Sequence, residues 1–339
     1  MKRFILAAAA LVMAGATAGA QAVDLTGAGS SFAYPIYSKW AAEYAAKTGV
    51  HINYQSIGSG GGIRQLSEMT VDFGATDGPM TDEQMSKAKG GAILHIPTVI
   101  GAVAISYNLP SVTQPLKLDG PTLAAIYLGK ITKWNDSRIR ALNPGVALPD
   151  KDIVVVHRSD GSGTTFIVTD YLSVVSPEWA KGPGKGTDVQ WPTGIGAKGT
   201  EGVAGQIRQI EGAVGYVELA YALQNKLAYA LLKNAAGKFV PPTLEGASEA
   251  AAGTAAKLPA SSDFRISIVN APGAGSYPIS SFTWIVLYKN QADAAKGKKL
   301  VDFIRWALEN GDAAATSLQY ATMPKSMKAK VLARLKEVK

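Results

Sequence analysis

Residues 153–175 read IVVVHRSDGSGTTFIVTDYLSVV and combine three kinds of local sequence. The branched run at 153–156 predicts a buried strand, the glycine and serine residues that follow it predict a turn, and residues 164–175 predict a helix. Short apolar runs alternate in the same way with segments of helical period along most of the chain. This alternation predicts an α/β fold.

The other elements are predicted in the same way. Helices are expected at residues 35–48, 121–128, 219–225, 246–257 and 298–309, and strands at 50–54, 71–75, 93–96, 99–107, 214–217 and 282–287. Thr81 and Gln84 form a capping box that predicts a further helix. Residues 181–200 are rich in glycine and lysine, which predicts a loop. The GxGxxG pattern at 194–199 is interpreted as a chance match, because neither a preceding strand nor a directly following helix is predicted.

Length and composition restrict the possible classes of protein. The chain has 339 residues, more than the roughly 250 to 300 at which a single hydrophobic core stops growing, so two lobes are expected. It has no cysteine, which excludes disulfides, thiolate metal sites and a cysteine nucleophile. The three histidines lie far apart in the sequence, so we predict no metal site and no cofactor. The basic run at 325–339 is interpreted as a solvated helix face and not as a nucleic-acid site.

The N-terminus has the sequence features of a secretory signal peptide. Lys2 and Arg3 precede an apolar run at residues 4–13, and Ala20-Gln21-Ala22 forms a cleavage site of the A-x-A type. Residues 1–22 are therefore predicted to be removed. No later segment reaches the 18 apolar residues that a membrane span requires, so the mature chain is expected to be exported without membrane insertion. In a Gram-negative host its location would be the periplasm.

Three turns in the chain have the composition of an anion site. They lie at residues 27–32 (GAGSSF), 58–62 (GSGGG) and 160–164 (DGSGT), each before a predicted helix. The first N–H groups of a helix lack intrahelical partners and carry a partial positive charge, so such a turn binds anions readily. Each turn alone is more often a simple helix cap. Three of them together with Arg158 favour an anion-binding function.

Several segments resemble one known family, the periplasmic phosphate-binding proteins of bacterial high-affinity phosphate ABC transporters. The matching segments, in chain order, are LTGAG at 25–29, YQSIGS at 54–59, VDFGATD at 71–77, IYLGKI at 126–131, RSDGSGT at 158–164 and GYVE at 215–218. They are spread over most of the mature chain, so the resemblance is more specific than any single glycine turn.

The resemblance implies a two-lobed type II periplasmic-binding-protein fold, with a mixed sheet flanked by helices in each lobe and phosphate in the cleft between them. It implies a phosphate site formed by Ser31, Phe32, Ser59 and Asp77 of the first lobe and by Arg158, Ser162, Gly163 and Thr164 of the second, with Asp160 supporting the arginine. Ser31 stands where threonine is common in the family, and Gly60 where some relatives have a second serine.

Asp77 has two interpretations. The sequence Asp77-Gly78-Pro79 is typical of a turn, which would need no function. Inorganic phosphate, however, keeps at least one proton near neutral pH and can donate a hydrogen bond to a carboxylate, whereas fully ionised sulfate cannot. If Asp77 accepts that proton, it selects phosphate over sulfate.

The expected function is a phosphate receptor that delivers its ligand to the permease of an ABC transporter, without an enzymatic step and as a monomer. We expect residues 23–104 with 276–339 to form lobe I and residues 105–275 to form lobe II. Three alternatives remain open: a receptor for another oxyanion or a phosphate ester, a secreted phosphatase with Ser162 or Ser31 as nucleophile, and an adhesion or matrix protein. The phosphatase would need a metal or a strong base, and neither is evident near these serines.

Overall fold

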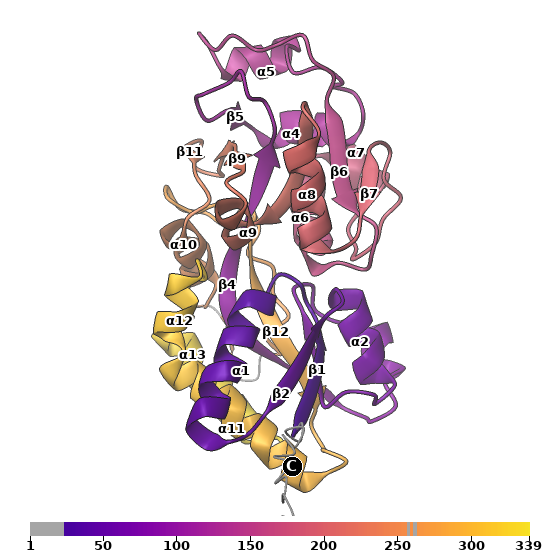
Figure 1. Cartoon of the computed structure of the whole chain (residues 1–339), viewed down its shortest axis with the longest axis vertical. Helices are drawn as coiled ribbons and strands as arrows, with labels where there is room; N and C mark the ends of the chain where they lie inside the picture. The colour runs from indigo at the N-terminus through magenta and orange to yellow at the C-terminus, as the bar shows by residue number, and fades with distance from the viewer. Residues whose placement is uncertain (1–23, 256–257, 260–262) are drawn as a thin grey trace, which may run out of the picture.

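One long strand, β4 (Ile93–Tyr107), connects the two lobes of the molecule (Figure 1). The structure is a computed structural model and describes residues 24–255, 258–259 and 263–339. The predicted signal peptide lies outside these residues. Residues 93–102 of β4 pair antiparallel with β12 (Ser280–Tyr288), and residues 103–107 pair antiparallel with β8 (Ala213–Glu218). The strand therefore belongs to the sheets of both lobes.

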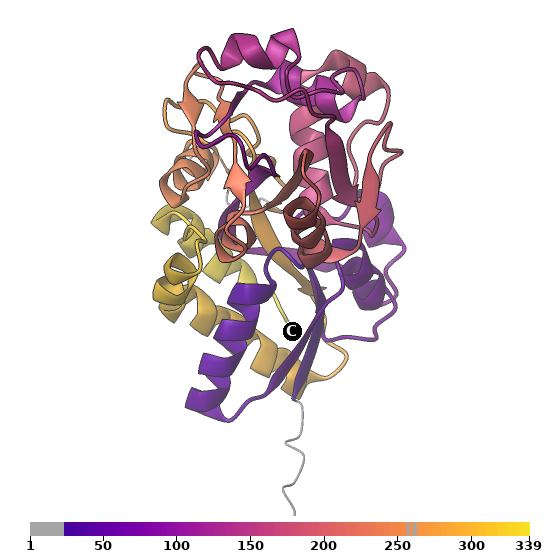
Figure 2. The same cartoon turned by 45° about the horizontal axis from the view of Figure 1, so that its top comes forward.

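In the first lobe the strand order is β2-β1-β3-β12-β4. β1 (Leu25–Gly29) pairs in parallel with β2 (Ile52–Ser56) and with β3 (Phe73–Thr76), so the carboxyl ends of these three strands lie at one edge. The flanking helices are α1 (Tyr34–Thr48), α2 (Ser59–Ser67), α3 (Asp82–Ser86), α11 (Ala294–Asn310), α12 (Asp312–Ser317) and α13 (Lys325–Leu335). The C-terminal helices, yellow in Figures 1 and 2, lie beside α1.

In the second lobe the sheet continues as β4-β8-β6-β7, with β6 (Val154–Arg158) parallel to β8 and to β7 (Ile195–Ala197). The two-residue strand β9 (Ala228–Tyr229) also pairs with β4. The helices are α4 (Gly120–Tyr127), α5 (Ser137–Leu142), α6 (Gly163–Val175), α7 (Pro177–Lys181), α8 (Gly199–Gln209), α9 (Leu219–Gln224) and α10 (Leu244–Ala255). A small separate sheet contains β5 (Lys117–Leu118), β10 (Leu231–Lys233) and β11 (Phe239–Val240).

Helix α1 illustrates how the local sequence produces these elements. Pro35 occupies its first turn, where the missing N–H costs no hydrogen bond, and Gly49 ends it in the left-handed conformation at φ 75°. Ile36, Trp40 and Tyr44 lie on its buried face. The Tyr44 ring packs 5.4 Å from that of Phe303 on α11, which fixes α1 on the C-terminal helices.

Two predictions about secondary structure were wrong. The strands expected at 93–96 and 99–107 are one strand, because a bulge at Thr98 compensates for Pro97, which has no N–H for the ladder. A helix, α8, does begin directly at Gly199, within the predicted loop. Its sequence contains three glycines and therefore has low helix propensity. Burial of Val203, Ala204 and Ile207 in the core beside β8 stabilises it instead.

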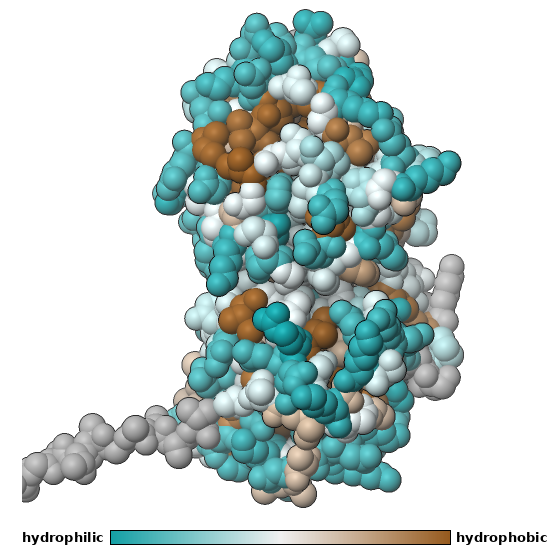
Figure 3. Space-filling view, turned by 90° about the vertical axis from the view of Figure 1, so that its right-hand side faces the viewer, coloured by the Kyte–Doolittle hydropathy of each residue, from teal (hydrophilic) through white to brown (hydrophobic). Residues whose placement is uncertain are grey.

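The face of the molecule seen in Figure 3 is mainly polar. Figure 3 shows hydrophilic residues over most of both lobes, with hydrophobic residues gathered in patches that are largest on the second lobe. Among the described residues, no helix has both the length and the apolar character required to cross a bilayer.

Candidate anion site between the two lobes

The three predicted anion turns meet at the junction of the lobes. Every residue that the sequence placed in the site is buried there: Ser31, Phe32, Ser59, Asp77, Arg158, Ser162, Gly163 and Thr164. Hydrogen bonds connect the two lobes here. The hydroxyls of Ser31 and Thr200 lie 3.1 Å apart, and the Gly60 N–H donates to the Gly161 carbonyl at 2.9 Å. The carboxyl ends of the parallel strands thus bring residues from distant parts of the chain together.

Arg158 is the cation of this site, and its side chain is only 2% exposed. Its Nε and Nη2 donate to the two carboxylate oxygens of Asp160 at 2.7 and 2.6 Å, and its Nη1 donates to Thr200 Oγ1 at 3.3 Å. Burial is the largest single influence on the pKa of Arg158 and lowers it, but the hydrogen bonds to Asp160 and the negative charges of Asp160 and Glu218 together outweigh burial and raise the pKa of the guanidinium. Burial raises the pKa of Asp160, but the hydrogen bonds and the positive charge of Arg158 oppose it, and the pKa of this carboxyl is lowered. Both groups are therefore charged.

Asp77 is a buried carboxyl held by hydroxyl groups. It accepts hydrogen bonds from Ser30 at 2.5 Å, from Thr283 at 2.7 Å and from Ser59 at 3.3 Å. Burial raises the pKa of Asp77 to about 6, although the hydroxyl donors and the charge of Arg158 oppose this rise. Asp77 thus has structural partners of a kind that a simple turn residue does not need.

Glycine allows the two lobes to approach closely. A Cβ atom on Gly163, the first residue of α6, would lie 2.5 Å from both Asp77 Oδ2 and Ser59 Oγ of the other lobe. Gly58 has φ 81°, and a Cβ there would lie 2.5 Å from Asp160 Oδ2. Any larger residue at either position would separate the helix N-termini that face each other.

Three tyrosine hydroxyls fix the loop before α1. Tyr54, Tyr221 and Tyr320 donate to the successive carbonyls of residues 30, 31 and 32, at 2.8, 3.1 and 2.5 Å. Tyr221 belongs to α9 of the second lobe, so its bond is a further contact between the lobes. The Phe32 ring lies against Gly101, where a Cβ would overlap it.

Several residues at the site were not found from the sequence. Thr200 lies in a segment predicted to be a loop, Ser30 lies in the first predicted anion turn but was not assigned to the site, and Thr283 lacks a distinguishing motif. Glu218 ends β8 and accepts hydrogen bonds from Thr164 at 2.7 Å and from Thr200 at 3.3 Å. Burial raises the pKa of Glu218 to about 7, against the opposing effect of the Thr164 hydroxyl. The only sequence signal for this residue is its place in the segment 215–218, which contributes to the family resemblance.

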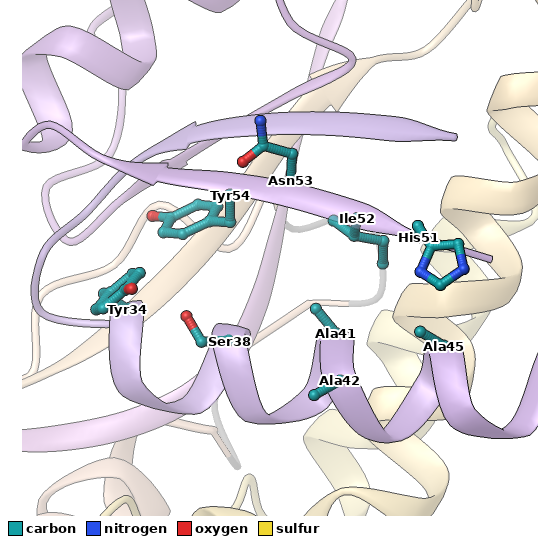
Figure 4. Close-up of a pocket in the computed structure, with 9 residues that line it drawn as sticks. All are labelled: Tyr34, Ser38, Ala41, Ala42, Ala45, His51, Ile52, Asn53 and Tyr54. Carbon is teal, nitrogen blue, oxygen red and sulfur yellow. The ribbon is translucent and has the colours of Figure 1, made fainter. Parts of the chain in front are cut away.

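A separate surface groove lies between α1 and β2 (Figure 4). Small residues of α1 line one side of it, and the rest of its lining includes Tyr34, His51, Ile52, Asn53 and Tyr54. No lysine or arginine lines it, so it lacks the charge that an anion site requires. In the described part of the chain, no group of three or more His, Asp and Glu residues could hold a metal ion.

Comparison with known proteins agrees with this architecture. Residues 15–310 match the model of the PBP superfamily domain. The chain is 50% identical over 308 residues to the phosphate-binding protein PstS of Xylella fastidiosa strain Temecula1, with 91% of this chain and 83% of the relative covered. It is 48% identical over 321 residues to PstS of Pasteurella multocida, with 94% and 92% covered. A crystal structure of a phosphate-binding protein from Stenotrophomonas maltophilia superimposes with a TM-score of 0.69 at 22% identity, covering 92% of this chain and 94% of the other. The chain therefore belongs to the PBP superfamily, in the family of the PstS phosphate-binding proteins.

Proposed function

We propose that this protein captures inorganic phosphate between its two lobes and delivers it to the permease of an ABC transporter. The observation that carries the proposal is the buried Arg158–Asp160 pair, surrounded by serine and threonine hydroxyls and helix N-termini from both lobes. Such a set of donors suits a small tetrahedral oxyanion. The names of the relatives in Xylella and Pasteurella support phosphate as that anion.

In this proposal each group has a defined part in binding. The guanidinium of Arg158, the N–H groups at the starts of α1 and α6, and the hydroxyls of Ser31, Ser59, Ser162 and Thr164 donate hydrogen bonds to phosphate oxygens. Asp77 accepts the proton that phosphate retains. Asp160 keeps Arg158 in position, because its two oxygens hold the fork of the guanidinium in one orientation.

We further propose that ligand entry requires the lobes to separate, with lobe I formed by residues 23–104 and 276–339 and lobe II by residues 105–275. The change of partner along β4, from β12 to β8 between Ala102 and Val103, supports a crossing near residue 104. The direct contacts between Ser31 and Thr200 and between Gly60 and Gly161 would break on opening. Periplasmic binding proteins are a standard example of such closure.

The proposal also covers location and chemistry. The sequence of residues 1–22 supports export to the periplasm, where the mature chain would act as a monomer without an enzymatic step. A phosphatase would need a base beside Ser162, but Ser162 Oγ caps α6 by accepting from the Thr165 N–H at 3.1 Å. His157 stacks on Trp191 at 4.8 Å and its Nδ1 lies 3.0 Å from the Arg158 carbonyl oxygen, which gives it a structural environment.

Two measurements test the proposal. Heat denaturation of purified protein should release about one phosphate per chain, and protein first freed of phosphate should melt at a higher temperature when phosphate is added. A ligand that binds only the folded state stabilises it by about 2.7 kcal/mol at a hundredfold excess over Kd. If phosphate-free protein shows no upward shift at millimolar phosphate, the proposed function is wrong.

A further inference from the structure

Glu218 is a buried carboxyl behind the proposed phosphate site. It is 1% exposed and lies between the N-termini of two helices, with Thr164 of α6 and Thr200 of α8 both donating to Oε1. Its other oxygen, Oε2, is buried and has no hydrogen-bond partner among the described residues. Burying a charged carboxylate oxygen without a hydrogen-bond donor costs free energy. Burying the carbonyl oxygen of a neutral carboxylic acid in the same way costs less.

The hydroxyl of Thr164 has one proton, and Glu218 determines where that proton points. An ionised carboxylate can only accept, so Thr164 must direct its proton to Oε1 and can offer an anion only lone pairs. A protonated Glu218 can donate to the Thr164 oxygen instead. The threonine proton is then free to point into the site and to donate to the anion.

The charges around Glu218 favour the neutral form when an anion is bound. The site contains one cation, Arg158, and three carboxyl groups, Asp77, Asp160 and Glu218. Arg158 lowers the pKa of Glu218 and Asp77 raises it, but burial has the largest effect and raises it to about 7. An anion in the site adds further negative charge, which raises this pKa again.

The other titratable groups near Glu218 do not take up the proton in its place. Tyr221 on α9 and Tyr320 are both affected by the charge of Glu218, and each has its pKa raised chiefly by burial, so both stay neutral. Glu201 on α8 is exposed, and its Oε1 lies 3.0 Å from the Tyr221 hydroxyl, which shares its single proton between Glu201 and the Ser31 carbonyl. Glu218 accepts hydrogen bonds from both Thr164 and Thr200, whereas Arg158 donates to Thr200 at 3.3 Å.

We propose that Glu218 is a positioning residue whose protonation makes Thr164 a hydrogen-bond donor, so that phosphate binding is coupled to the uptake of one proton at Glu218. This inference rests on the proposed function. The proton comes from solvent and joins the Glu218 carboxylate, and no other covalent bond forms or breaks. The coupling applies at pH values above the pKa of Glu218 in the free protein, where the carboxyl must regain its proton on binding.

The variant Glu218→Gln tests the proposal, because glutamine is neutral and retains one acceptor and one donor group. Calorimetric Kd values for phosphate are measured from pH 5.5 to 9 in both proteins. The ratio of the two Kd values at each pH removes the effect of phosphate's own protonation, because this effect is the same for both proteins. We expect similar affinities below pH 6, and above pH 7.5 a tenfold loss per pH unit in wild type relative to the variant. Asp170→Asn is the matched control, since Asp170 is buried on α6 but bonds Lys185 and Ser267; its ratio to wild type should not change with pH.

The outcomes are distinct. A constant ratio across the pH range would overturn the proposal, and so would a folded Glu218→Gln protein that binds phosphate more than tenfold more weakly than wild type at pH 8.5. Failure of wild type to bind phosphate at any pH would instead overturn the proposed function. If the variant does not fold, infrared difference spectra of Asp77→Asn protein at pH 8.5 give the same information. A protonated-carboxyl band should appear when phosphate is added, and its absence would refute the coupling.

Discussion

Replacement of Arg158 by alanine gives the strongest test of the site, because the chain contains a matched control. Arg138 also forms a two-pronged pair with an aspartate two residues away, its Nε and Nη2 lying 3.0 and 2.9 Å from the Asp136 oxygens. The two pairs differ in burial, since the Arg158 side chain is 2% exposed and the Arg138 side chain 47%. The comparison therefore separates the effect of burial from that of the fork geometry.

The expected loss of stability follows from what Arg158→Ala leaves behind. Breaking a buried ion pair by removing one partner costs about 3 to 5 kcal/mol. Asp160 would retain the Gly199 N–H at 3.0 Å, and its side chain is 16% exposed, so we expect a value of about 3 kcal/mol. Arg138→Ala should reduce the free energy of unfolding by no more than about 1 kcal/mol, as is typical of exposed pairs.

Phosphate affinity should separate the two variants further. Loss of a desolvated charged partner costs about 2 to 5 kcal/mol of binding, which corresponds to an increase in Kd of about 30-fold to 5,000-fold for Arg158→Ala. Arg158→Lys keeps the charge but loses the fork, so its Kd should be intermediate. Arg138→Ala should bind like wild type.

Urea unfolding and calorimetry on phosphate-free protein measure both quantities. A folded Arg158→Ala protein that binds phosphate within twofold of wild type would refute the assignment, since Arg158 would then lie outside the site. Equal effects of Arg158→Ala and Arg138→Ala on stability would show that burial does not govern the strength of these pairs.

Three further predictions concern the same site. Asp77→Asn replaces an acceptor with an amide that can donate, so sulfate should compete measurably for bound radiolabelled phosphate in the variant, and complete exclusion of sulfate would assign Asp77 a structural role only. Gly163→Ala should weaken phosphate binding by at least tenfold in calorimetry, because its Cβ would collide with Asp77 and Ser59. Gly205→Ala is the control and should leave affinity unchanged, since a Cβ there would have no neighbour within 4 Å. Equal affinities of the two variants would disprove the close approach of the lobes at Gly163. Burial raises the pKa of Asp77 to about 6, so native phosphate-free protein binds more protons than unfolded protein between about pH 4 and 6. The free energy of unfolding, measured in urea, should therefore fall as pH rises through this range. The fall should be smaller in Asp77→Asn.

Local sequence was sufficient for the parts of the site that lie within a few residues of each other. Arg158 and Asp160 form their pair across two residues, and the turn between them and α6 contains the cap residue Ser162. Helix starts and glycine turns are short-range features, so the three turns proposed to bind the anion could be recognised in the sequence alone. Local sequence did not predict α8, where burial overcomes a glycine-rich segment.

The contacts that complete the site depend on the tertiary structure. Thr200 reaches Ser31 across 169 positions, Thr283 reaches Asp77 across 206, and Thr164 reaches Glu218 across 54. Such pairs have no periodicity or spacing in the sequence, because strand pairing and lobe packing decide them. β12 pairs with β3 just before Asp77, β6 pairs with β8 just before Thr164 and Glu218, and Ser31 meets Thr200 where the two lobes touch. From the sequence alone we could predict the α/β class, three glycine turns that meet between the lobes, and Arg158 beside one of them. Only the packing of the two lobes decided which carboxyls are buried beside them, since burial and the donors that surround a group set its charge.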